Sequence, residues 1–205
     1  VRKDSLYCDR ADSITRRAAR TALDEIFNCL TAWLAPFICF TAEEAWLQRH
    51  PGDEESVHLR QFPDIPDDWR DDVLGKKWET VRHLRRVVTG ALEVERAEKR
   101  IGSSLQASPV IYADEVSRNA VANMSPEQLA DLFITSTARF ADGPAPEGAF
   151  MLDDVAGVAV MPETANGDKC IRCWKITDDI GANADHPETC GRCADAADHH
   201  PGTAE

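Results

Sequence analysis

The sequence lacks every short motif by which a catalytic site is commonly recognised. It has no glycine-rich phosphate loop, no Gly-x-Ser-x-Gly turn and no His-Glu-x-x-His motif. It also lacks any run of about 18 apolar residues, the minimum for a membrane-spanning helix. The chain starts at Val1 without a methionine or an apolar signal segment. We therefore expect a non-catalytic fragment of a longer cytoplasmic polypeptide that does not bind membranes.

Positive charge is also scarce, with 23 Lys and Arg against 36 Asp and Glu and a net charge of −13. Since nucleic-acid affinity depends on clustered cations, this balance excludes a general nucleic-acid binder. Any RNA site must use a local basic patch. The two candidate patches are Arg16, Arg17 and Arg20, and later Arg96, Lys99 and Arg100, which follow Arg82, Arg85 and Arg86 on the same helix. Glutamates interleave with the second patch, so ion pairs within one helix are the alternative explanation.

The first half of the chain has apolar residues at helical spacing. The first predicted helix is capped by Ser13 or Asp12 and ends before Pro36. A second helix is predicted up to residue 50, and a third from 67 to 100. Three helices with short connections predict an antiparallel bundle. Gly90 within the third helix indicates a close packing contact or a bend.

The second half changes character after Gly102. Residues 108–112, 132–135 and 155–160 read as strands, and Ser125-Pro126 begins a helix. We predict a mainly α fold in three parts. An antiparallel helical bundle (1–102) precedes a small α+β connector (103–164) and a four-cysteine zinc ribbon with a disordered tail (165–205).

Four of the seven cysteines form two tight pairs near the C-terminus. A Cys-x-x-Cys turn places two thiolates about 2.3 Å from one ion, and two turns complete a tetrahedral shell. Four thiolates favour zinc, with iron the main competitor, and a closed shell leaves no position for a reacting water. We predict one structural Zn²⁺ bound by Cys170, Cys173, Cys190 and Cys193. Two redox pairs or a disulfide-bonded end are the alternatives.

An aromatic residue and several cations accompany these cysteines. They are Arg172, Trp174, Lys175 and Arg192. A flat ring beside cations on a metal-held turn is typical of single-stranded RNA recognition, in which bases stack on the ring. Alternatively, Trp174 packs the ribbon on its neighbour.

Four segments, in order along the chain, resemble bacterial isoleucyl-tRNA synthetases. Residues 2–9 resemble the segment before the anticodon-binding bundle, and Trp33-Leu-Ala-Pro-Phe37 with Phe40-Thr-Ala-Glu-Glu-Ala-Trp46 is similar to the bundle itself. Residues 93–105 resemble the end of its long helix, and 169–175 with 186–193 its C-terminal zinc finger. The ATP-site motifs and the editing domain of the family are absent.

This resemblance implies a tRNA-binding part of a monomeric isoleucine-tRNA ligase. It would grip the anticodon stem-loop of isoleucine tRNA while a catalytic domain elsewhere in the parent synthetase performs ATP-dependent charging. The four cysteines would hold zinc, and Trp174 with its basic neighbours would face the anticodon. The predicted RNA contacts are Trp174, Lys175, Arg172, Arg192, Arg96, Lys99 and Arg100.

Two other functional classes remain open from the residues alone. One is a zinc-ribbon module that docks on a protein partner and binds no RNA, for which apolar patches should dominate the exposed surface. The other is the end of a DNA-repair glycosylase, which carries a similar finger but needs a catalytic N-terminal residue that Val1 does not supply.

Overall fold

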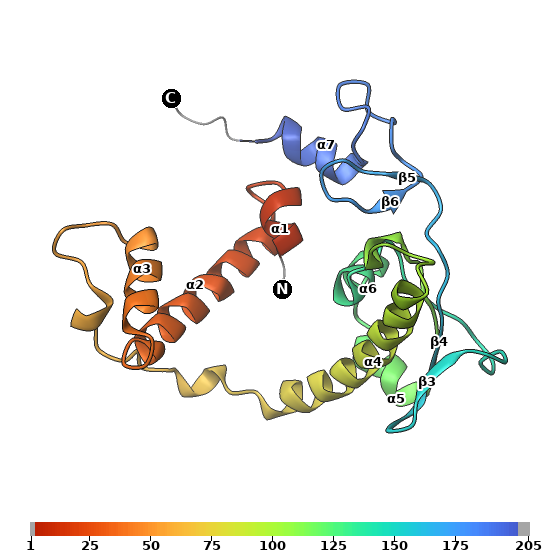
Figure 1. Ribbon diagram of the computed structural model, residues 1–205, viewed down its shortest axis with the longest axis horizontal. Helices are drawn as coiled ribbons and strands as arrows, with labels where there is room; N and C mark the ends of the chain where they lie inside the picture. The colour runs from red at the N-terminus through yellow and green to blue at the C-terminus, as the bar shows by residue number, and fades with distance from the viewer. Residues whose placement is uncertain (1–2, 201–205) are drawn as a thin grey trace. The chain divides into compact units, whose positions relative to one another are not determined.

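The computed structural model describes residues 3–200 of the chain (Figure 1). Packing divides the described chain into two compact units, one ending at Arg70 and the other spanning Asp71–His199. The described elements include seven α-helices and a small mixed sheet, which confirms the predicted mainly α fold class. None of the described helices is long and apolar enough to cross a membrane.

The first unit is helical. Its elements are α1 (Lys3–Cys8), α2 (Ile14–Leu34), α3 (Cys39–Arg49) and two 3-10 turns, η1 (Val57–Leu59) and η2 (Asp67–Trp69). Ser13 caps α2 as predicted, because its hydroxyl accepts a hydrogen bond from the Arg16 amide. The helix α2 packs on α1 and on α3, and η1 packs on α3.

A small core centres on Trp46, which is buried with Ala35, Ala42 and Val57. The ring of His50 stacks on the indole at 3.9 Å between centroids, and the Arg60 guanidinium lies 4.0 Å from the indole centroid. The Trp46 motif that carried the family resemblance is therefore largely a packing motif.

The second unit begins with the long helix α4 (Asp72–Ala97). Its other elements are η3 (Ser104–Gln106), β1 (Val110–Ala113), α5 (Glu115–Val121), α6 (Pro126–Phe133), β2 (Arg139–Phe140), β3 (Phe150–Leu152), β4 (Val155–Met161), β5 (Asp168–Lys169), β6 (Ile176–Thr177) and α7 (Gly191–Asp198). The main sheet has the order β2-β1-β4-β3, in which only β1 and β2 are parallel. Strands β5 and β6 form a separate antiparallel ribbon.

Helix α4 packs on β4, β3, α5 and α6. Its apolar face supplies Leu84, Val87 and Val88 to the core of the second unit, all of them fully buried. A Cβ on Gly90 would lie 2.9 Å from two ring carbons of Phe150, so Gly90 marks the close packing contact that was predicted. The long helix thus groups by packing with the sheet, and the boundaries at residues 102 and 164 stay predictions.

Two local predictions were wrong. Residues 132–135 are not a strand, because α6 continues to Phe133 and Ile134 closes it in the left-handed conformation. The capping box of Ser125 and Gln128 starts this helix, and burial of Phe133 extends it. The tail after Cys193 is helical to Asp198, since Ala194 and Ala196 are buried. Residues 201–205 of the predicted disordered tail lie outside the described part.

Candidate metal centre and RNA-binding surface

Cys170, Cys173, Cys190 and Cys193 come together in the second unit. Their sulfur atoms all lie within 4.8 Å of one another, and all four side chains are buried. The two Cys-x-x-Cys turns therefore meet as their spacing predicted, although Cys173 and Cys190 are 17 positions apart in sequence.

Backbone hydrogen bonds shape both turns around the sulfurs. The Trp174 amide donates to the Cys170 carbonyl at 2.9 Å and closes the first turn. The Cys190 amide donates to the Cys170 sulfur at 3.4 Å and links the second turn to the first. Cys190 is also the N-cap of α7, and the Gly191 amide donates to the Asp179 carboxylate at 2.7 Å.

The cluster fits a tetrahedral zinc ion. Four Zn–S bonds of about 2.3 Å require sulfur atoms about 3.8 Å apart, and the Cys173 and Cys190 sulfurs are 3.7 Å apart. The hydrogen bond between these two sulfurs lowers the pKa of Cys190 and raises the pKa of Cys173. Four buried thiol sulfurs, all within 4.8 Å of one another, are the donor set of structural zinc sites.

Trp174 is exposed directly beside the cluster, with 58% of its surface accessible. Its φ of 67° lies in the left-handed region, which disfavours side chains other than glycine. The Lys169 ammonium lies 5.6 Å from the centroid of the indole. The ring thus stands open with a cation on it, rather than packing the ribbon on its neighbour.

Lys169 was not among the predicted site residues. It lies in β5, whose partner β6 follows Trp174, so the ribbon brings the two side chains together. Its position directly before Cys170 was the available signal.

The arginines inside the two turns differ in their surroundings. Arg172 is exposed, and its Nη1 donates to the Cys193 carbonyl at 3.1 Å, which ties the first turn to the start of α7. Arg192 is half-buried in the first turn of α7. Both remain beside the cluster as predicted.

The structure gives Lys175 a role other than the predicted RNA contact. Its side chain is 11% exposed, and its Nζ lies 2.7 Å from a carboxylate oxygen of Asp131, a residue of α6 that is itself 15% exposed. The next residue, Ile176, donates its amide to the Ser136 hydroxyl at 2.6 Å. Lys175 therefore fastens the ribbon to the α+β part of the second unit and has little surface left for a ligand.

The second basic patch lies at the end of α4. Arg96 pairs with Glu93 at 2.7 Å, and Arg100 donates to both carboxylate oxygens of Glu95 at 2.6 Å. The Arg100 hydrogen bond lowers the pKa of Glu95. Within the described chain, Lys99 is exposed and makes no ion pair. Two of the three predicted RNA contacts in this patch, Arg96 and Arg100, are thus already paired with glutamates.

Comparison with known families identifies the class of this protein. The chain belongs to the family described as the anticodon-binding domain of tRNA ligase, whose sequence profile matches residues 1–111, more than half of the chain. A second family, described as the zinc finger found in FPG and IleRS, matches residues 167–196, which include the cysteine cluster.

The curated relatives are isoleucine–tRNA ligases, which confirms the resemblance. That of Brucella abortus biovar 1 (strain 9-941) is 53% identical over 197 residues, which are 96% of this chain and 20% of the relative. That of Agrobacterium fabrum (strain C58) is 48% identical over 196 residues, again 96% of this chain and 20% of the relative. The chain thus spans about a fifth of the length of these relatives.

Proposed function

We propose that this chain is the tRNA-binding part of an isoleucine–tRNA ligase and recognises the anticodon stem-loop of isoleucine tRNA. ATP-dependent charging would take place in a catalytic domain elsewhere in a monomeric, cytoplasmic synthetase. The observation that carries the proposal is the exposed Trp174 ring, held in a left-handed conformation beside Lys169 on a cysteine-clustered turn. The family match supports the same function.

The cysteine cluster would hold one zinc ion through Cys170, Cys173, Cys190 and Cys193. An ion bound by four thiolates supplies folding free energy and no reactive water. The protein's own contribution is to present Trp174 at a fixed position, because the first turn of the cluster carries it. An unstacked base of the anticodon loop could then stack on the indole while Lys169 and Arg172 face its phosphates.

Other parts of the synthetase would cover the apolar surface of the first unit. Phe37, between α2 and α3, and Phe40, at the start of α3, are 82% and 92% exposed, and Trp33 is 43% exposed. Exposed apolar side chains gathered at one place are typical of a protein–protein contact. These side chains favour docking of the first unit to the rest of the synthetase. The same exposed apolar surface would be expected of a protein-docking module, the alternative function.

The proposal is tested by tRNA binding to the zinc-loaded chain. We expect tighter binding to isoleucine tRNA than to the same tRNA with a swapped anticodon, and Trp174→Ala should weaken it about 5- to 150-fold, the range for loss of one stacked base. Zinc content and helicity should not change. Ile171→Ala, which removes another exposed side chain of the same turn, is the matched control. Equal affinity of wild type and Trp174→Ala would refute the stacking role.

A further inference from the structure

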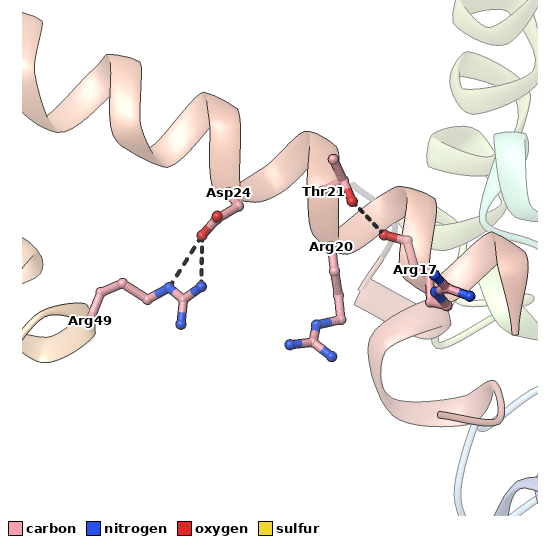
Figure 2. Close-up of a pocket in the computed structure, with 5 residues that line it drawn as sticks. All are labelled: Arg17, Arg20, Thr21, Asp24 and Arg49. Carbon is pink, nitrogen blue, oxygen red and sulfur yellow. Dashed lines mark hydrogen bonds and ion pairs between the residues drawn. The ribbon is translucent and has the colours of Figure 1, made fainter. Parts of the chain in front are cut away.

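A groove on the first unit carries positive charge that its own structure does not neutralise. It has a volume of about 260 Å³ and is lined by Arg17, Arg20, Thr21, Asp24 and Arg49 (Figure 2). We call it the arginine groove. Three arginines and one aspartate line this groove, in a chain whose net charge is −13.

Among the described residues, only the guanidinium group of Arg49 has a partner in this groove. Nε and Nη2 of Arg49 donate to the same oxygen of Asp24 at 3.2 and 2.8 Å, which orients the group. Within the described residues, the side chains of Arg17 and Arg20 make no hydrogen bond or ion pair. Figure 2 shows Arg20 leaving α2 on the side where Asp24 meets Arg49, so two cations border the same space.

This arrangement opposes the stability of α2. Arg20 lies four residues after Arg16 and three after Arg17, and like charges at these spacings destabilise a helix. The first turn of α2 contains no acidic residue, although the helix dipole favours negative charge there. A bound anion would relieve both effects.

The neighbouring surface indicates what else the ligand contains. Arg20, Asp24 and Arg49 also border a larger groove of about 690 Å³. Its remaining walls are mostly apolar: Leu6, Tyr7, Arg16, Leu23, Ile26, Phe27 and Leu30. The Tyr7 ring is 68% exposed, and the buried Nε of Arg16 has no hydrogen-bond partner among the described residues. A charged groove that opens onto an apolar one fits a phosphate joined to a sugar and base better than it fits an acidic side chain.

We propose that the arginine groove binds a phosphodiester of the RNA backbone, through Arg20 and Arg49 with Arg17 at its edge. The inference rests on the proposed RNA-binding function and adds to it a contact on the first unit. Guanidinium groups suit this ligand because their fork of N–H donors matches two phosphate oxygens. Asp24 acts as a positioning residue that holds Arg49.

The test is tRNA binding to the zinc-loaded chain as a function of salt concentration. For Arg20→Ala we expect a loss of about fivefold at 150 mM salt and a salt slope smaller by about 1, as for one lost phosphate contact. Arg20→Lys should keep the slope. Arg82→Ala, which removes an exposed helical arginine of α4 and the same charge, should change neither quantity. Because the Arg20 side chain makes no hydrogen bond or ion pair with another described residue and alanine favours helix, Arg20→Ala should unfold at the same temperature as wild type or slightly higher.

The outcomes separate this proposal from the function on which it rests. If the wild-type chain does not bind tRNA, the proposed function fails. If wild type binds tRNA and Arg20→Ala behaves like Arg82→Ala, phosphodiester binding in the groove is refuted while the proposed function stands. The groove would then suit a carboxylate of a protein partner instead. If inorganic phosphate raises the unfolding temperature of wild type but not of Arg20→Ala, and tRNA binding is equal in both, the groove takes free anions and the RNA assignment is overturned.

Discussion

The zinc ribbon and the first helical unit reach a folded state by different means. From residue 165 to 200, the buried side chains are the four clustered cysteines, Ala194, Ala196 and Lys175. The helical unit instead buries an indole and aliphatic side chains around Trp46. Small side chains remove little apolar surface from water, so the ribbon depends on its metal and on its attachment to the α+β part, whereas the helical unit has a hydrophobic core.

The two regions also differ in what their cations do. Beside the metal motif, Lys175 is buried against Asp131, whereas Arg172 is exposed and donates one hydrogen bond to a carbonyl. On α2, Arg17 and Arg20 line an open groove, and their side chains make no hydrogen bond or ion pair with another described residue. Proximity to a strong motif is therefore a poor guide to which cations are available for a ligand.

Metal removal should separate the two regions most strongly. A chelator, or Cys190→Ser, should unfold the ribbon while α2, α4 and the main sheet persist, because bound zinc contributes an apparent ~10–16 kcal/mol in small zinc domains. Zinc content and amide exchange resolved by residue would measure this. Cys39→Ser, at an exposed cysteine outside the cluster, should change neither. Ribbon amides that stay protected without metal would contradict the comparison.

The Lys175–Asp131 pair should come next in size. Lys175→Met removes the ammonium group from the half-buried Asp131 carboxylate and should cost about 1.5–3 kcal/mol of unfolding free energy, the range for hydrogen bonds to charged groups. Combining Lys175→Met with Asp131→Leu should recover part of the loss, because two apolar side chains can replace a buried ion pair. Denaturant unfolding of the single and double variants measures this. A smaller salt slope for tRNA with unchanged stability would instead make Lys175 an RNA contact.

Trp174→Gly should raise the unfolding free energy slightly, whereas the preceding variants lower it. Glycine adopts the left-handed conformation without strain, so the variant should gain about 1 kcal/mol of stability while binding tRNA as weakly as Trp174→Ala. Urea unfolding compares the glycine variant with the alanine one, in which the strain remains. A less stable glycine variant would show that the indole packs the ribbon on its neighbour, as the alternative interpretation held.

Sequence patterns correctly predicted the features that depend on a few neighbouring residues, such as helix caps and metal-binding turns. Ser13 caps α2, Ser125 with Pro126 begins α6, and the cysteine spacing brings four sulfurs together. Residues 132–135 were misassigned because a short apolar run has no clear period, and burial of Phe133 decides for helix.

The helix caps and the apolar periods depend on residues close together in the sequence, and each Cys-x-x-Cys turn is likewise local, so the sequence alone determined these features. Other contacts join residues that are far apart in the sequence. Lys175 pairs with Asp131 on α6, and Arg49 pairs with Asp24 on α2. Gly90 packs closely against the ring of Phe150. Those pairings arise only when the helices and strands pack. For Lys175 and Asp131, burial also makes an unpaired charge costly. Tertiary packing therefore buried Lys175 against Asp131 and left Arg17 and Arg20 at an open groove.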